Sequence, residues 1–395
     1  MIYSVKANRD TTIYEFTSSM NTGIDEILQI EKTVSASNTA NTYNSRILID
    51  FDLTEISRSV SAGAIGTQLY MSSPEYFLNL YTVAASSIDY AYGIEAFPIS
   101  ESWNMGRGRR IDRKSQGGAI ITETEGASWK YRDGEKYFGT QWNSGSSLAA
   151  TYGTGSFTTE PGGGTWYGPS SLDYGQASQS FNYELTDVRL NVTDIVNSWF
   201  SGEIPQNGFI VLRSGSQESG EVNEERNGKP LGSLTFFSTD THTVYQPKLE
   251  VISYDSMYDT NLNVLNTTLT ESIVDIKNMK SKYPAKSRET FRLVVREKFP
   301  AKSYDTVSSA LTQNVLPEKT YYSVRDYATD EVVIPYNNPG TQLSADDNGN
   351  HFKLWMDQFY PERRYRFVFK TVGGNYDFPT SQSIFDNDYI FKVTN

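Results

Sequence analysis

The two histidines of the chain, His242 and His351, are the only imidazole groups available for acid–base or nucleophilic catalysis. A Ser-His-Asp arrangement would have to use one of them, and neither lies in a motif typical of a serine nucleophile. His242 lies in the polar stretch STDTHTV, and His351 follows a turn. Two histidines without cysteine leave too few ligands for a multi-histidine or thiolate metal site. We therefore interpret both as ordinary loop or strand-edge residues and expect no cofactor or metal.

Carboxylates are abundant, with 47 Asp and Glu residues in a chain of 395, but no spacing selects two of them as the acid pair of a glycoside hydrolase. Because charged residues are seldom buried, we interpret most of them as solvated surface groups. The stretch DDNGN at residues 346–350 contains part of a calcium-loop pattern, yet the closing Glu is missing. Its Asn-Gly pair is typical of a tight turn between strands, which is the interpretation we favour.

A basic cluster, formed by Arg107, Arg109, Arg110, Arg113 and Lys114, interrupts an otherwise acidic region. Such a cluster could bind phosphate or sulfate groups, or the acidic face of another copy of the chain. It could equally be a solvated loop. As a functional interpretation we favour the docking of subunits.

Four aromatic residues lie in segments rich in Gly and Ser between residues 104 and 178: Trp129, Trp142, Trp166 and Tyr167. On loops, such rings can stack on sugars or anchor a protein interface. The alternative is a small satellite core beneath the loops. Because these residues would be out of place in a flexible spacer, we expect residues 104–178 to be an ordered insertion in a β-sheet domain.

The elements that would position these residues are predicted to be strands. Aromatic residues make up 13% of the chain, mostly Tyr and Phe, and clusters rich in Gly, Ser and Asn separate short apolar runs. Residues 45–53 (SRILIDFDL) alternate apolar and polar side chains, as a strand with one buried face does. The fold class expected is all-β, with two antiparallel β-sandwich-like domains, the first carrying the Gly-, Ser- and Trp-rich insertion.

Residues 190–212 contain the densest local signals in the chain. Thr193 is expected to cap a short helix whose apolar stripe includes Trp199, and Gly202 is placed to end this helix. An Asn-Gly turn then leads into an apolar strand that begins at Phe209. The side chains expected in the structural core are Phe51, Trp103, Trp199 and Phe209.

Charge divides the chain in two. Residues 257–395 hold 17 basic and 17 acidic residues, so residues 1–256 carry the whole net charge of −12. We predict a first domain over residues 1–254, a linker over residues 255–268 and a second β-sandwich domain over residues 269–395.

Composition also bears on partners and location. An acidic first domain argues against nucleic-acid binding, which requires a basic surface. The N-terminal residues MIYSVKANRD lack the apolar core of a signal peptide, and no apolar run approaches the ~18 residues of a membrane span. Without Cys there are no disulfide bonds. We expect synthesis in a cytoplasm and neither a membrane nor a nucleic-acid partner.

Fragments of the first domain resemble the DNRLRE-domain family, a β-sandwich of secreted and surface proteins related to some carbohydrate-binding modules. The matching pieces, in order, are DTTIY at 10–14, NTG at 21–23, RILIDFDL at 46–53, Ser102-Trp103, NVTDIVNSWFSGEIPQNGF at 191–209, and Phe237-Ser238 followed by QPKL at 246–249. The chain departs from the family pattern in its long insertion and at Gln246, where many members have Arg. The resemblance implies a β-sandwich over about residues 3–254.

The whole chain is also similar in style to virion structural proteins of large tailed phages, especially marine T4-like ones. The shared features are NTGIDEIL, YNSRILIDFDL, SWKYRDG and a β-rich C-terminal region ending in Phe-Lys-Val. This resemblance implies a non-enzymatic tail, neck, baseplate or fibre-attachment component that contacts other virion proteins and copies of itself. A carbohydrate-binding adhesin using the loop aromatics is the alternative, and an enzyme acting on polysaccharides is the third hypothesis.

Overall fold

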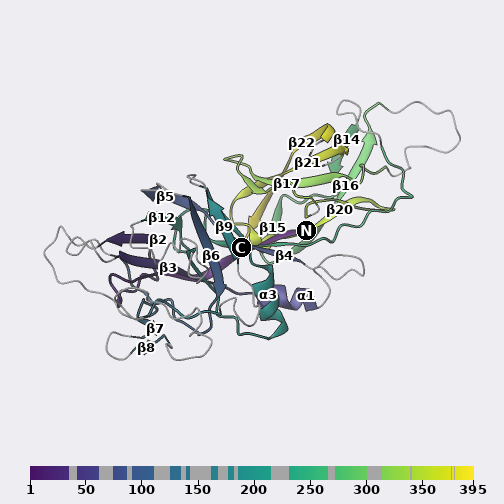
Figure 1. Cartoon of the computed structure of the whole chain (residues 1–395). Helices are drawn as coiled ribbons and strands as arrows, with labels where there is room; N and C mark the ends of the chain where they lie inside the picture. The colour runs from purple at the N-terminus through teal and green to yellow at the C-terminus, as the bar shows by residue number, and fades with distance from the viewer. Residues whose placement is uncertain are drawn as a thin grey trace, which may run out of the picture. The chain divides into compact units, whose positions relative to one another are not determined.

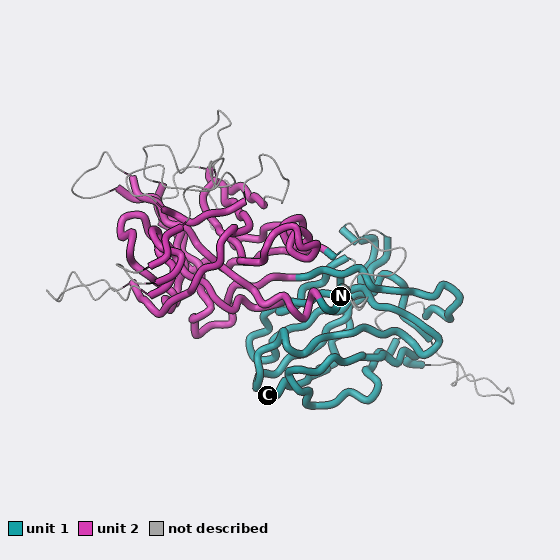
Figure 2. Tube along the Cα trace, turned by 90° about the horizontal axis from the view of Figure 1, so that it is seen from below, with its two compact units in different colours: residues 1–4, 58–74, 251–395 teal, residues 5–57, 75–250 magenta. Residues whose placement is uncertain are grey.

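The computed structural model describes residues 1–34, 42–61, 74–86, 91–110, 125–134, 139–142, 162–167, 177–181, 186–214, 231–265, 272–299, 314–338, 340–374, 376–377 and 379–395. The chain forms two compact units, which are described separately (Figure 2). Unit 1 comprises Met1–Ser4, Arg58–Pro74 and Val251–Asn395, and unit 2 comprises Val5–Ser57 and Glu75–Glu250. The first four residues thus belong with the C-terminal part of the chain, whereas the expected first domain ran without interruption from residue 1 to 254.

Unit 2 is built on antiparallel strands (Figure 1). The strands that lie wholly or mainly in this unit are β1 (Ile2–Tyr14), β2 (Ile27–Val34), β3 (Thr42–Phe51), β4 (Glu75–Leu80), β5 (Thr82–Ser86), β6 (Tyr92–Pro98), β7 (Tyr131–Asp133), β8 (Thr140–Gln141), β9 (Ala177–Phe181), β10 (Val188–Asn191), β11 (Phe209–Arg213), β12 (Gly232–Phe237) and β13 (Lys248–Ile252). The main sheet has the order β10-β4-β13-β1-β3-β11-β6-β9. A branch begins at the start of β3, where β2 pairs with β3, β12 pairs with β2, and β5 pairs with β12. The expected all-β, sandwich-like class is therefore confirmed.

Strand β3 is the central element of unit 2, because it pairs with β1, β11 and β2. We expected one buried face, but Arg46, Ile47, Leu48 and Ile49 are all fully buried. The reason is that Leu48 belongs to a second hydrophobic cluster, to which the insertion contributes Ala127, Trp129, Trp142 and Trp166. The insertion thus covers the face of the sheet that the alternating pattern assigned to solvent.

Helix α3 (Thr193–Ser201) and strand β11 close the core around Trp199. Gly202 ends the helix in the left-handed conformation (φ 77°), as expected, and its N–H donates to the carbonyls of the last turn. Trp199 packs on Phe209 with ring centroids 4.7 Å apart, and Phe209 lies 6.1 Å from Phe51. The four expected core residues, Phe51, Trp103, Trp199 and Phe209, are all buried.

The predicted cap of helix α3 was wrong. Val192 is the N-cap residue, and no side chain caps the helix. Thr193 lies one position later, where its Oγ1 accepts a hydrogen bond from the Tyr76 N–H (3.0 Å) and donates to Asn191 Oδ1 (2.6 Å). The hydroxyl therefore ties the helix to strand β4 instead of satisfying the helix's own amides.

Unit 1 is a second set of strands: β14 (Ser272–Ile276), β15 (Lys282–Pro284), β16 (Arg288–Glu297), β17 (Thr320–Asp326), β18 (Val332–Ile334), β19 (Ser344–Asp346), β20 (Gly349–Trp355), β21 (Arg364–Gly374) and β22 (Pro379–Thr394). They form two sheets, β14-β16-β20-β19 and β15-β22-β21-β17-β18. Short helical elements are α1 (Thr54–Ser61), whose second half belongs to this unit, and the 3-10 turn η2 (Met356–Gln358).

The two sheets of unit 1 are joined by phenylalanine rings. Phe291 and Phe352 from one sheet stack at 5.2 Å. Each also contacts Phe367 of the other sheet, at 4.8 and 5.3 Å, and Phe367 stacks on Phe391 at 4.7 Å. Edge and offset contacts between buried rings at these separations stabilise a core beyond the area that they bury.

Residues 255–265, expected to be part of a linker, are hydrogen-bonded within unit 1. The Ala345 N–H donates to the Met257 carbonyl (2.8 Å), and the Asp259 N–H donates to the Ala345 carbonyl (3.2 Å). This segment therefore lies along strand β19 as an additional extended piece, and its backbone polar groups are paired as buried strands require.

Candidate functional site

The three tryptophans expected as interface candidates on the loops are buried. Trp129 and Trp166 have no exposed surface, and Trp142 is 5% exposed. They form one cluster with Trp103, Leu48 and residues of β6 and β11. Their expected role at a glycan or protein interface is thus not supported, because the rings pack on the sheet; the alternative of a satellite core describes them.

Arg46, the arginine of the motif at 46–53, lies at the centre of this cluster. Its guanidinium carbon is 4.8 Å from the Trp129 ring centroid and 5.0 Å from that of Trp166. Its Nη1 donates to the Gly163 carbonyl at 2.6 Å. A guanidinium held between two indoles, and itself fully buried, combines cation–π attraction with apolar packing. We name this group, Arg46, Trp129, Trp166 and Gly163, the arginine–indole cluster.

The glycine run at 162–164 is what allows this approach. All three residues have positive φ, at 130°, 89° and 88°. A Cβ on Gly163 would lie 2.4 Å from Arg46 Nη1 and 2.9 Å from the Trp129 ring. Any other residue would therefore displace the guanidinium or the indole. The glycines of the insertion thus allow Arg46 and Trp129 to pack closely against its backbone at this position.

Tyr167, the fourth aromatic candidate, is half-buried next to this cluster. Its N–H donates to the Pro98 carbonyl (3.0 Å), and Trp166 forms a β-bridge with Ile99. Residues 165–167 thus extend the pairing at the end of β6.

The arginine candidates differ from one another in their surroundings. Arg110 is held within unit 2: its guanidinium hydrogen-bonds to Gln29, lies 3.6 Å from a Glu31 carboxylate oxygen and sits 4.7 Å above the Tyr14 ring. Burial raises the pKa of Glu31, and the charge of Arg110 opposes that shift. Arg113 and Lys114 lie outside the described residues.

Arg107 and Arg109 are exposed. In the described part of the chain neither guanidinium has an ion pair within 4 Å, although the charge of Arg109 acts on the carboxyls of Asp25 and Asp240. Burial raises the pKa of both carboxyls, and Arg109 lowers it. Arg109 therefore lies close to opposite charges on unit 2. We name these residues, together with the exposed Arg107 two positions earlier in the chain, the charged surface (Arg107, Arg109, Asp25, Glu26 and Asp240).

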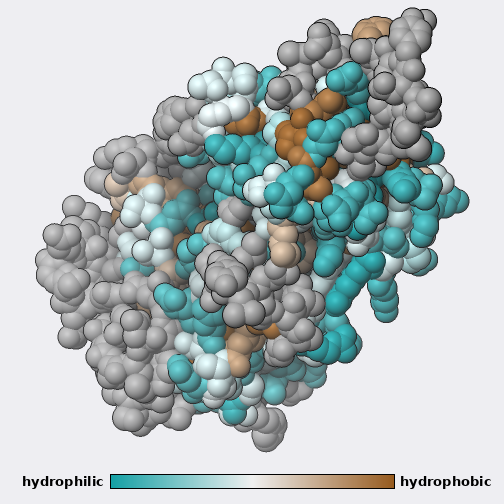
Figure 3. All heavy atoms as spheres, turned by 90° about the vertical axis from the view of Figure 1, so that its right-hand side faces the viewer, coloured by the Kyte–Doolittle hydropathy of each residue, from teal (hydrophilic) through white to brown (hydrophobic). Residues whose placement is uncertain are grey.

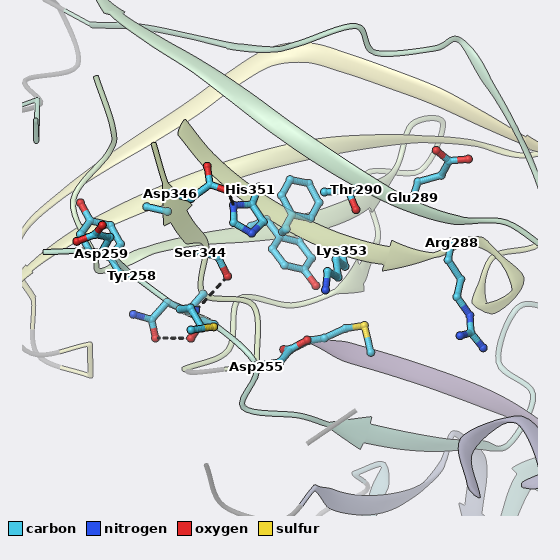
Figure 4. A pocket seen from close by; sticks show the side chains of 18 of the residues that line it. Asp255, Tyr258, Asp259, Arg288, Glu289, Thr290, Ser344, Asp346, His351 and Lys353 are labelled. Carbon is cyan, nitrogen blue, oxygen red and sulfur yellow. Dashed lines mark hydrogen bonds and ion pairs between the residues drawn. The ribbon is translucent and has the colours of Figure 1, made fainter. Parts of the chain in front are cut away.

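A cavity of about 830 Å³ in unit 1 contains the histidine that could support chemistry. Its lining includes Asp255, Asp259, Glu289, Ser344, His351 and Lys353 (Figure 4). His351 Nδ1 lies 3.6 Å from Asp346 Oδ2. Burial lowers the pKa of His351, although the Asp346 charge opposes this, so the imidazole is uncharged at neutral pH.

The His351–Asp346 pair does not continue to a nucleophile. Asp346 is engaged by Arg292 through two hydrogen bonds of 2.8 and 2.9 Å, which lower the pKa of its carboxyl. Ser344 lies directly opposite His351 in the strand pair, but its Oγ accepts a hydrogen bond from the Met257 N–H (3.1 Å). In the described part of unit 1, His351 has no hydrogen bond to a hydroxyl group, as a Ser-His-Asp triad would require.

The DDNGN stretch forms the turn between β19 and β20. Asp346 is paired with Gly349, the Asn348 N–H donates to Asp346 Oδ1 (2.8 Å), and Gly349 has φ 104°. Among the described residues, no group of three or more His, Cys, Asp or Glu side chains is arranged to hold a metal ion.

A group of surface rings that the sequence did not single out lies on unit 2. Tyr245 is 36% exposed, and its ring stacks on that of Phe237 with centroids 5.5 Å apart. The ring of Tyr81 also contacts Tyr245, at a centroid distance of 5.6 Å. Lys248 Nζ lies 5.2 Å from the Tyr81 ring. Leu234 and Phe236 alternate with outward positions in β12, so the period of two predicts that Phe237 points outward. An outward phenylalanine is the sequence signal that could have identified this group. Elsewhere, the face drawn in Figure 3 shows small apolar patches separated by hydrophilic side chains.

Comparison with known proteins assigns no family. No protein-family model matches the chain, and no curated protein is significantly similar to it. In the part of the chain that the structure describes, no helix is long and apolar enough to cross a membrane.

Proposed function

We propose that this chain is a structural protein of a virion, as a tail, neck, baseplate or fibre-attachment component, and that it acts by assembly with other virion proteins and with copies of itself. The observation that carries this proposal is that the indoles and the arginines of the insertion lie in different surroundings. Its indoles face inward and fix the loop base to the sheet, while Arg107 and Arg109 face solvent. A rigidly anchored loop base that presents charge is suited to contacts between subunits.

The charged surface supports a contact between like subunits. Because Arg109 lies near the carboxylates of Asp25 and Asp240, the same surface carries both signs of charge, and a two-fold contact can pair the exposed arginines with a partner's carboxylates. The similarity of NTGIDEIL, YNSRILIDFDL and SWKYRDG to segments of phage structural proteins supports the same function.

The test uses particles assembled with variant chains. Arg107→Glu combined with Arg109→Glu should reduce incorporation into particles at least tenfold, because like charges then face each other across the contact. Arg364→Glu, which reverses an exposed arginine of unit 1, is the matched control and should be incorporated normally. Equal incorporation of all three chains would contradict docking through the charged surface.

Glycan binding is the second candidate function, and the surface rings favour it at a new position. Tyr245, Phe237 and Tyr81 offer an accessible aromatic group, whereas Trp166 is buried. A glycan array would show binding that Tyr245→Ala abolishes and that Tyr327→Ala, at a 45% exposed tyrosine of unit 1, leaves intact. An array without binding removes this candidate.

A further inference from the structure

Three buried polar side chains meet where β3 begins: Glu15, Lys32 and Asn44. Glu15 and Lys32 have no exposed surface, and Asn44 is 3% exposed. Lys32 on β2 and Asn44 on β3 are direct partners in an antiparallel pair. Glu15 follows the last residue of β1 and hydrogen-bonds to Asn44 from the other edge of β3. Burial of a lysine, a carboxylate and a carboxamide together is rare enough to require an explanation.

The backbone hydrogen bonds show how Lys32 faces Asn44. Asn44 directs its backbone toward Glu15: its carbonyl accepts from the Glu15 N–H (2.9 Å), and its own N–H donates to Glu15 Oε2 (2.9 Å). The Lys32 carbonyl accepts from the Leu231 N–H (3.1 Å) on its opposite side. Lys32 and Asn44 are therefore a non-hydrogen-bonded pair, the type in which Cα atoms are about 4.5 Å apart and side chains are closest. The four-carbon stem of lysine easily spans that separation.

The carboxylate of Glu15 lies against the amide of Asn44. Asn44 Nδ2 donates to Glu15 Oε2 at 3.2 Å. Asn44 Oδ1 is buried and accepts no hydrogen bond from the described residues. A carboxyl group on the amide nitrogen is positioned to deliver a proton to it, while Lys32 is the residue paired with Asn44 on the neighbouring strand.

We propose that Lys32 and Asn44 condense to an intramolecular isopeptide bond, with Glu15 as the proton carrier. The uncharged Lys32 Nζ attacks Asn44 Cγ and forms the new N–C bond. Glu15 accepts the proton released from Nζ and transfers it to Nδ2. The Cγ–Nδ2 bond then breaks and ammonia leaves, so that one amide replaces another and no oxidant, metal or cofactor takes part.

The surroundings favour this reaction over an ordinary buried ion pair. Removal from water disfavours a charged ammonium and so favours the amine, which is the nucleophilic form of lysine. The opposed positions on paired strands hold the reacting groups together, which replaces a bimolecular encounter by an intramolecular one. The product would join β2 to β3 covalently in a chain that contains no cysteine for a disulfide.

The experiment is mass spectrometry of the folded, full-length chain as purified. Its intact mass should be about 17 Da, one ammonia, below the mass calculated from the sequence. Trypsin should fail to cleave after Lys32, because an acylated lysine is not recognised, and a single peptide over residues 10–46 should carry the loss. A full intact mass, with separate peptides over residues 10–32 and 33–46, would overturn the proposal.

Variants separate the bond from other losses of ammonia. Lys32→Met and Glu15→Gln should each restore the mass calculated for that variant. Cyclisation of Asn44 onto its own backbone would also release ammonia, but it would persist in Lys32→Met and would leave cleavage after Lys32 intact, so that result overturns the proposal. The measurement on the unchanged chain decides the question even if a variant fails to fold, and it does not depend on the proposed function.

Discussion

The two units bury different chemistry in their cores. Among the described residues, unit 2 buries seven charged side chains: Asp10, Glu15, Lys32, Arg46, Asp50, Glu95 and Arg213. In the described part of unit 1 the single equivalent is Asp326, which is paired with Arg363 at 2.8 Å. Unit 1 is instead filled by phenylalanine rings. Both units thus have apolar cores, but the core of unit 2 also contains buried charged side chains that require polar partners.

The difference has consequences for specificity and for pH. Truncating a packed apolar side chain leaves a cavity, whereas removing the partner of a buried charge leaves that charge uncompensated. In unit 2 the buried groups also fix particular segments: Arg46 holds the glycine run, and Asp10 accepts hydrogen bonds from the N–H and hydroxyl of Thr239 (2.8 and 3.0 Å). Four predictions test this contrast, from the largest expected effect to the smallest.

Phe352→Ala should destabilise unit 1 by about 3–5 kcal/mol, since it removes a fully packed ring from between the two sheets. Hydrogen–deuterium exchange with mass spectrometry should show lost protection in strands β16, β20 and β21, with unit 2 unchanged. An equal loss in both units would show that the units do not have separate cores.

Arg46→Ala should destabilise unit 2 by about 2–4 kcal/mol, because it opens a cavity between two indoles and leaves the Gly163 carbonyl without a donor. Five of the six tryptophans belong to unit 2, so urea unfolding followed by tryptophan fluorescence reports on this change. Arg364→Ala, at an exposed site, is the control and should shift the midpoint little. A neutral Arg46→Ala would mean that the arginine–indole cluster does not anchor the insertion.

Asp10 should make the stability of unit 2 depend on pH. Burial raises the pKa of Asp10 to about 7, with the Asp240 charge adding to the shift and the Thr239 hydrogen bonds opposing it. As pH rises from about 4 to 7, the unfolded chain loses this proton before the folded chain does, so the carboxyl progressively destabilises the fold. Asp10→Asn should therefore gain stability relative to the unchanged chain by on the order of 2 kcal/mol between pH 5 and pH 7.

The measurement is urea unfolding of both chains at several pH values. The difference between them should be small near pH 4 and level off above pH 7. A difference that is constant with pH would show that Asp10 ionises normally within the fold.

Arg107→Glu should change the stability of unit 2 by less than about 0.5 kcal/mol, as expected for an exposed side chain that takes part in no hydrogen-bonded network of the described residues. Its midpoint of urea unfolding should match that of the unchanged chain. An unchanged midpoint would separate residues of the insertion that stabilise the fold, such as Trp129, from residues that are available for contacts with other subunits, such as Arg107. A large loss of stability would place Arg107 in the first group.

Local sequence patterns predicted the elements that are determined by residues near each other in the sequence. The apolar stripe and Gly202 defined helix α3, and alternation identified β3. Patterns failed where distant segments meet. Nothing near Trp129 or Trp166 indicates that Arg46, more than eighty residues earlier, lies between them. The buried Lys32 was detectable, since it follows Leu28 and Ile30 at a spacing of two in β2 and so shares their inward face.

The proposed function is tested most directly by mass spectrometry of purified virions from the source of this chain. The chain should be present at a fixed copy number relative to the major structural proteins in particles purified at physiological ionic strength, where exposed charge contacts are only partly screened. Absence of the chain from particles, with the chain found only as a free protein, would contradict a structural role in the virion.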